Sequence, residues 1–219
     1  MSSIFPPGRE FSINFDWADV NSGTGYILYD CWGSRNNAGN TFHLTPHTYM
    51  NTLTGSGYSS ETRIRQLDGS VGSDIDTDFD STPLQRPTSL RGQAIIRLGA
   101  YVETNAANTI NLRPTIKLRK WDGATETEIA SVTGAPIDYT AGGAGGGRVG
   151  NWTLVIDVPK TNFKIGEQIR ITLSTGFTNV GNGSIAIDSN DLEIAFTHQS
   201  LIAGETLFAV ALPFELRRD

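Results

Sequence analysis

Residues 92–121 read GQAIIRLGAYVETNAANTINLRPTIKLRKW, and this stretch decides the fold class. Apolar residues recur at every second position in its first half, where Ala94, Ile96, Leu98, Ala100 and Val102 share one face. Such alternation is typical of a strand with one buried face. The segment NAANT then turns the chain into a second strand that ends at Trp121. Pro114 has no backbone N–H, so we predict that this second strand lies at an edge or carries a bulge.

The same alternation recurs along the chain between turn residues and predicts an all-β protein with little helix. Further strands are expected at residues 10–17, 25–32, 61–67, 125–132, 151–160, 168–175, 191–198 and 206–216. Pro213 predicts an edge or a bulge near the end of the last one. About ten strands joined by turns favour an antiparallel two-sheet sandwich, most like a jelly roll.

The chain shows no internal repeat and is expected to form a single domain. Residues 1–9 are predicted to be an extended N-terminal arm, because Pro6 and Pro7 cannot donate to a strand ladder. Residues 10–219 then form the sandwich. Residues 33–60 are irregular and predict a long loop, and the acidic segment 74–83 predicts another loop.

Composition narrows the classes of function. The net charge of −6 over 219 residues argues against a nucleic-acid-binding surface, which needs clustered Lys and Arg. The basic residues Arg113, Lys117, Arg119 and Lys120 gather on one predicted strand. We interpret them as a solvated outer face or, alternatively, as a contact for an acidic partner. The single cysteine, Cys31, excludes an intrachain disulfide and is expected to be buried.

No targeting or catalytic motif is found. The N-terminus lacks a signal-peptide pattern and no apolar run is long enough to span a membrane, so synthesis in a host cytoplasm and no membrane partner are expected. The Gly-rich run at 142–147 is followed by Arg and Val rather than by Lys and Ser or Thr, so it is not a phosphate-binding loop. We therefore expect a protein that is not an enzyme.

Four aspartates alternate along one acidic segment: Asp74, Asp76, Asp78 and Asp80. In an extended chain their carboxylates would share one side and repel one another unless a cation bound. The segment lacks the Gly and Glu of an EF-hand loop. Two interpretations stay open, a solvated acidic loop and a site for Ca²⁺ or a basic partner; no other cofactor is expected.

Two further sets of residues are candidates for binding. The apolar residues of the arm, Ile4, Phe5, Pro6 and Pro7, suit docking on a neighbouring subunit. The four tryptophans, Trp17, Trp32, Trp121 and Trp152, are either core residues or a shelf on which sugar rings stack.

Three stretches carry a resemblance to a known family: residues 13–32 (INFDWADVNSGTGYILYDCW), residues 155–173 (VIDVPKTNFKIGEQIRITL), and LEIAFTH with FAVALPFEL near the C-terminus. They resemble the jelly-roll virion structural proteins of tailed bacteriophages, in particular small capsid decoration proteins. The resemblance implies a homo-oligomer, often a trimer, located in the virion and seated on the major capsid protein through arms and loops. FKIGEQIRITL is also similar to a segment of carbohydrate-binding modules. A sugar-binding module for host recognition and a tail or fibre component are therefore the alternatives.

Overall fold

The protein is described here from a computed structural model, whose chain is placed at residues 24–36, 39–46, 63–66, 75–104, 109–140, 146–178, 183–186 and 208–215. Strands and their connections account for all of these residues, and none of them is helical. The all-β prediction is confirmed for this part of the chain. No helix in this part of the chain is long and apolar enough to cross a membrane.

The described residues form twelve strands. Their bounds are β1 Thr24–Asn36, β2 Gly39–Pro46, β3 Arg63–Gln66, β4 Ile75–Asp80, β5 Thr88–Thr104, β6 Thr109–Trp121, β7 Glu126–Thr133, β8 Ile137–Thr140, β9 Gly146–Phe163, β10 Gln168–Thr178, β11 Gly183–Ala186 and β12 Phe208–Glu215. The strands predicted at 10–17 and 191–198 lie outside the described residues. The arm at residues 1–9 also lies outside them.

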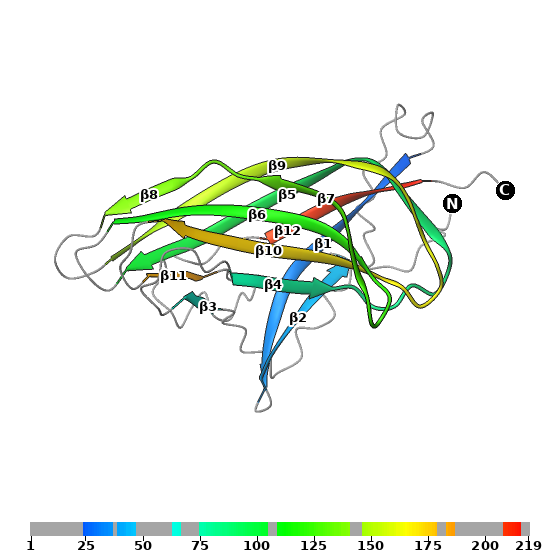
Figure 1. Ribbon diagram of the computed structural model, residues 1–219, viewed down its shortest axis with the longest axis horizontal. Coiled ribbons are helices and arrows are strands. Elements are labelled where there is room, and N and C mark those ends of the chain that lie inside the picture. The colour runs from blue at the N-terminus through cyan, green and yellow to red at the C-terminus, as the bar shows by residue number, and fades with distance from the viewer. Residues whose placement is uncertain are drawn as a thin grey trace, which may run out of the picture.

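The strands join into one mixed sheet that is nearly closed into a barrel (Figure 1). From one edge to the other the order is β9, β5, β12, β1, β2, β4, β10, β6 and β7. β11 and β12 pair with successive parts of the same side of β5, and β11 also pairs with β3. β7 and β8 likewise pair with successive parts of the same side of β6. All these pairings are antiparallel except that of β2 with β4.

The prediction of two separate sheets is therefore corrected. β2 and β4 are parallel neighbours joined at a single position, where His43 pairs with Asp80. This one link makes the two halves of the molecule a continuous sheet. Sequence alternation reports only which face of a strand is buried. It could not reveal that two strands from distant parts of the chain meet at this position.

Two prolines were expected to mark edges or bulges. β6 is an interior strand, with β10 on one side and β7 and β8 on the other, so an edge position for Pro114 is wrong. The Pro114 carbonyl accepts a hydrogen bond from the Gly134 backbone N–H on the side of β7 and β8. Because N and O of one residue point the same way in an antiparallel strand, the missing N–H faces the break between β7 and β8. Pro213 does lie at a bulge, where the register of β12 on β5 shifts.

The region predicted as a long loop begins with a hairpin instead. Residues 33–36 belong to β1 and residues 39–46 to β2, and the two strands pair from Tyr29 with Pro46 to Asn36 with Gly39. Gly, Asn and Ser are frequent here, which obscured the strand pattern. The rest of the predicted loop lies outside the described residues. Figure 1 shows the hairpin extending beyond the other described strands.

The core lies inside the barrel and receives side chains from both halves of the sheet. Phe79 of β4 meets Phe208 of β12 edge-on, with ring centroids 5.2 Å apart and an interplanar angle of 88°. Such aromatic pairs contribute about 0.5–1.5 kcal/mol beyond the burial of their area. The largest fully buried side chains are Phe79, Phe163, Phe208, Leu44, Leu90, Ile96, Leu98, Ile116, Leu118 and Ile169.

The two edges of the sheet, β9 and β7 with β8, are brought together by Trp152. Its indole Nε1–H donates a hydrogen bond of 2.8 Å to the carbonyl of Ala135, in the connection between β7 and β8. The ring is only 7% exposed. Gly134 and Gly150 lie against it so closely that a Cβ at either position would collide with the ring. Glycine at both positions therefore lets the indole fill the seam.

Replacing Trp152 should loosen this seam. Trp152→Phe removes the hydrogen bond to Ala135 and part of the ring, so we expect a loss of about 1–2 kcal/mol in the free energy of unfolding. Urea titration followed by far-UV circular dichroism measures it. Trp121→Phe is the matched control and should cost less than about 1 kcal/mol, since that ring contributes a cation–π contact at the surface. Equal losses for the two variants would contradict the role of Trp152 in closing the barrel.

Candidate functional site

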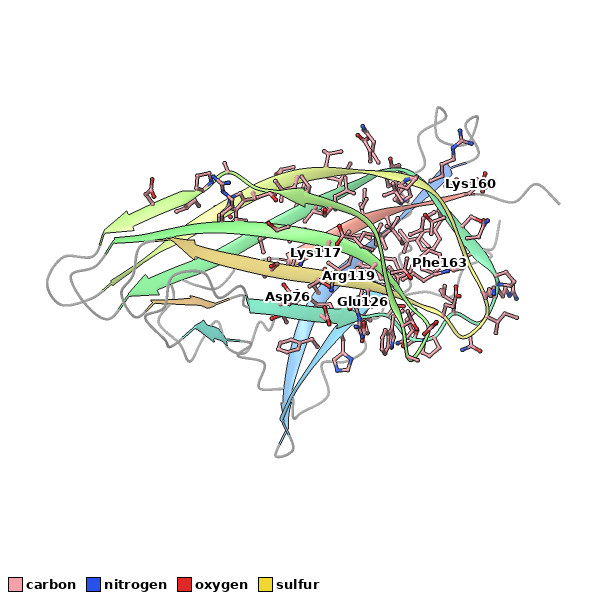
Figure 2. The ribbon with its side chains drawn as sticks, viewed as in Figure 1. Asp76, Lys117, Arg119, Glu126, Lys160 and Phe163 are labelled. Carbon is pink, nitrogen blue, oxygen red and sulfur yellow. The ribbon has the colours of Figure 1, made fainter. Side chains whose placement is uncertain are left out.

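The outer face of β4, β10, β6 and β7 carries the densest group of charged side chains in the described part of the chain. β4 contributes Asp76, Asp78 and Asp80, while Phe79 between them points into the core. This is the alternation that the sequence shows at 74–80, but the segment is a strand and not the predicted acidic loop. Lys117, Arg119, Glu126 and Arg170 complete the group, and Figure 2 shows four of its members together over the middle of the sheet.

Arg170 of β10 lies between carboxylates of neighbouring strands. Its Nε and Nη2 donate to the two oxygens of Asp80 at 2.6 and 2.7 Å, which is the bidentate geometry of a strong charge-assisted pair. Its Nη1 lies 3.3 Å from Asp78 and 3.8 Å from Glu126. The guanidinium also lies 4.3 Å from the centroid of the Trp121 ring. These contacts, with the hydrogen bonds to Asp80 first, raise the pKa of Arg170 and keep it charged.

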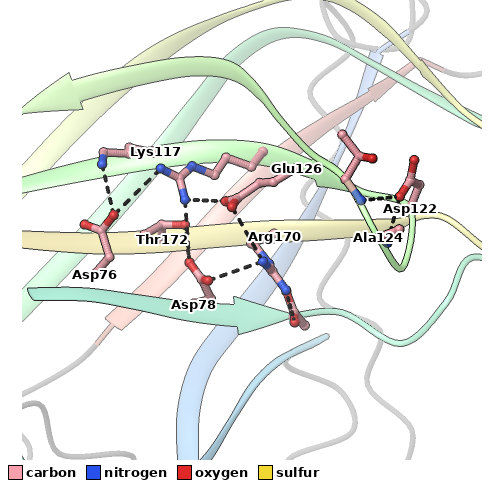
Figure 3. Close-up of polar contacts among 11 residues, drawn as sticks. Asp76, Asp78, Lys117, Asp122, Ala124, Glu126, Arg170 and Thr172 are labelled. Carbon is pink, nitrogen blue, oxygen red and sulfur yellow. Dashed lines mark hydrogen bonds and ion pairs between the residues drawn. The ribbon is translucent and has the colours of Figure 1, made fainter.

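Arg119 and Lys117 of β6 extend the same pattern toward the other end of β4 (Figure 3). Arg119 forms ion pairs with Glu126 of β7, with Asp78 at 3.8 Å and with Asp76 at 3.9 Å. Lys117 Nζ lies 3.3 Å from Asp76. Three cations thus alternate with four carboxylates across four strands. We call these seven residues the charged ladder: Asp76, Asp78, Asp80, Lys117, Arg119, Glu126 and Arg170.

The charged ladder places the predicted basic cluster and the predicted acidic run against each other. Of the basic cluster, Lys117 and Arg119 contact carboxylates of this same chain, and Lys120 pairs with Glu167 at 3.5 Å. Arg113 is exposed. The acidic partner considered from the sequence is therefore supplied in part by β4 itself.

The calcium prediction rests on four aspartates, of which Asp74 lies outside the described residues. The other three lie within reach of Lys117, Arg119 and Arg170. In the described ranges no three His, Cys, Asp or Glu side chains are grouped so as to hold a metal ion. Calcium binding by the aspartate run stays a prediction. What the geometry provides is compensation of the carboxylates by nearby cations.

The tryptophans proposed for sugar stacking are dispersed. Trp152 is in the core at the seam, and Trp121 is half-buried with the Arg170 guanidinium over its ring. The backbone of Trp32 lies in the β1–β2 hairpin, and Trp17 lies outside the described residues. The arm residues Ile4, Phe5, Pro6 and Pro7 also lie outside them.

Cys31 is buried, as predicted. Burial, together with the charge of Asp30, raises the pKa of its thiol well above the ordinary value, so the thiolate is disfavoured at neutral pH.

No protein-family model and no curated protein sequence matches this chain. Solved structures do match it. An aminopeptidase from the marine sediment archaeon Thaumarchaeota archaeon is 12% identical with a TM-score of 0.43, and the match covers 64% of this chain and 25% of that one. An α-amino acid ester hydrolase is 11% identical with a TM-score of 0.44, over 64% of this chain and 25% of that one. This chain thus spans about a quarter of the length of these hydrolases.

These matches correct the expectation that the chain is not an enzyme, since two of the proteins with a matching part are hydrolases. That expectation had rested on missing sequence motifs. Groups that act together in catalysis are brought together by folding, and a search for local motifs does not detect them. At identities of 11–12% the likeness concerns the fold, and it transfers no activity to this chain.

Virus particles are also among the matches. The structure of infectious bursal disease virus, Gx strain, is 14% identical with a TM-score of 0.27, and the match covers 88% of this chain and 55% of that one. The resemblance noted in the sequence is thus met in part, by a weak similarity to viral capsid proteins. None of these matches is to a decoration protein of a tailed phage.

The charged ladder predicts a specific dependence on Arg170. Arg170→Met removes the bidentate partner of Asp80 and leaves Asp78 and Glu126 with Arg119 as their remaining guanidinium. Removing one partner of a buried pair costs about 3–5 kcal/mol. These carboxylates are about a third exposed, so we expect about 2 kcal/mol by urea unfolding. Lys160→Met removes the exposed pair with Glu215 and is the matched control, with an expected cost below about 1 kcal/mol. Similar losses of unfolding free energy in the two variants would contradict a stabilising role for Arg170 in the charged ladder.

A second prediction concerns acid. Burial alone would raise the pKa of Asp76, but hydrogen bonds from Ser174 and Lys117 and the charges of Lys117 and Arg119 lower it below 3.8. A carboxyl whose pKa is lower in the folded state stabilises fully above its unfolded pKa, and this contribution is lost as the pH falls through the folded value. We therefore expect the urea concentration at the unfolding midpoint to decrease when the pH is lowered below about 4. The drop should be smaller in Asp76→Asn, and identical pH profiles for the two proteins would contradict this assignment.

Proposed function

We propose that this protein is a structural component of a virus particle, and more specifically a protein that binds the exterior of a tailed-phage capsid and stabilises it. The family resemblance of three sequence stretches motivates the proposal. The observation that carries it is the β1–β2 hairpin, which extends beyond the other described strands (Figure 1).

The outer part of this hairpin lacks neighbours among the described strands. β12 pairs with β1 only as far as Asp30, and β2 meets β4 only at His43. Beyond these positions the two strands pair with each other alone, down to Asn36 and Gly39. A two-stranded ribbon is marginally stable in water, and its outer edges present unpaired N–H and C=O groups.

Such a ribbon gains stability when a neighbouring subunit covers it or adds a strand to its edge. This is the kind of contact by which a decoration protein sits on a shell. The charged ladder, whose Asp80 is paired with His43 of the hairpin strand β2, supports the same proposal, because its carboxylates and cations neutralise one another and leave that face suited to solvent. The partner proposed for the hairpin is the major capsid protein or another virion protein.

A shortened hairpin tests the proposal. Gly33 and Phe42 face each other in the strand pairing, so an Asn-Gly turn can join them directly and replace residues 34–41. We expect the variant to keep its unfolding free energy within about 1 kcal/mol, since Phe42, which packs against the core and meets Phe79 edge-on, is retained. Mass spectrometry of gradient-purified virus particles should find the natural chain in many copies per particle and the shortened chain in the lysate only.

Ile165→Ser, in the exposed turn between β9 and β10, is the control and should be incorporated like the natural chain. If the shortened chain were incorporated as well as the natural chain, the hairpin would not be the contact with the particle. Absence of the natural chain from the particles would overturn the proposal itself.

A further inference from the structure

An apolar row crosses the outer face of the other half of the sheet. In the pairing of neighbouring strands, Leu28 of β1 lies opposite Ala211 of β12, and Ala211 lies opposite Ile95 of β5. Ile95 in turn lies opposite Val155 of β9. Their neighbours along the strands, such as Ile96 and Ile156, point into the core. The four residues of the row therefore all face outward.

The row is most exposed to solvent on β5 and β9. Ile95 is 41% exposed and Val155 46% exposed, and Leu28 and Ala211 are half-buried. Outward-facing positions of an antiparallel sheet are ordinarily polar when they face water. A continuous line of apolar residues across four strands is a contact surface rather than scattered exposure.

The charges that flank the row have opposite signs. Two residues further along β5 lies the exposed Arg97, which pairs with Thr153 in the ladder and has no ion-pair partner in the described part of the chain. On the opposite flank lies Asp157 of β9, which accepts a hydrogen bond of 3.0 Å from Gln93. Asp30 of β1 lies on the same flank as Arg97 but is only 2% exposed, so the exposed charges next to the row are Arg97 on one side and Asp157 on the other.

We propose that this face binds a second copy of the same chain, with a two-fold axis lying along the apolar row. Rotation about that axis lays each apolar residue over its own copy and turns the flank of one chain that carries Arg97 onto the flank of the other that carries Asp157. Arg97 then lies about one strand spacing, some 4.8 Å, to the side of the partner's Asp157, within reach of its long side chain. An axis along β5 would instead stack Arg97 on its own copy, so the charges favour the first arrangement over that one.

The size of the face sets the strength of the contact. Four strands at about 4.8 Å and five residues at about 3.4 Å span roughly 300 Å² of sheet. This is well below the roughly 800 Å² that each partner contributes to a standard interface. The dimer should therefore be reversible and depend on protein concentration. The inference stands apart from the proposed particle function, because it rests on the apolar row and its flanks and not on the hairpin.

Sedimentation equilibrium of the purified full chain, from about 1 to 200 μM, tests the proposal. We expect a monomer–dimer equilibrium. Ile95→Asp should raise the dissociation constant at least about tenfold, because it places a charge on the axis. Ile165→Asp makes the same change at a residue that is 66% exposed in a turn, and it should leave the dissociation constant unchanged. Thermal melts followed by circular dichroism establish that both variants are folded.

A charge exchange makes the test specific for the two-fold arrangement. Arg97→Glu and Asp157→Arg should each weaken the dimer, since each brings like charges together across the axis. The double variant should return to within about threefold of the natural dissociation constant. A monomer at every concentration, a trimer, a dimer insensitive to Ile95→Asp, or a double variant as weak as the single ones would each overturn the proposal.

Discussion

The structure depends on the closure of its sheet by Trp152. A sheet that ended at β9 and at β7 with β8 would present two open edges, with unpaired backbone groups along both. Here the edges meet, and the Trp152 indole fills the seam and donates to the Ala135 carbonyl. Because the closure is made by one side chain and by two glycines that admit it, the barrel holds a core without a continuous ladder at this position. The same closure fixes which faces of the remaining strands point outward.

Two outer faces of opposite character result. On β4, β10, β6 and β7, carboxylates and cations from four strands lie opposite one another, and Arg119 and Arg170 each contact three carboxylates. Because these charges are paired with one another within the chain, little unpaired charge is left on this face to bind an external ion. On β1, β12, β5 and β9, the outward positions include an apolar row with Ile95 and Val155 at its more exposed end. The first face is satisfied by its own chain, whereas burial of the second would gain free energy.

The sequence allowed prediction of those features that depend on neighbours along the chain. Alternation identified β5, β6, β9, β10 and β12, and the chemistry of proline identified the bulge at Pro213. Features that depend on distant pairing were missed. The sequence predicts a loop for the aspartate run because its cations come from β6 and β10, and an edge or a bulge for Pro114 because the break between β7 and β8 cannot be seen locally. The alternation of Asp76, Asp78 and Asp80 around the buried Phe79 was the signal for a strand that the charges obscured.

The hairpin and the apolar row share β1, and this limits how the two proposed contacts combine. Leu28 belongs to the row, and the outer part of the hairpin begins only five residues later, at Gly33. β1 runs in the same direction as β5, since both are antiparallel to β12. A two-fold axis across these strands reverses that direction in the second copy. The two hairpins of a dimer would therefore leave it in opposite directions. Such a dimer is suited to connecting two neighbouring sites on a particle, whereas a single chain would occupy only one.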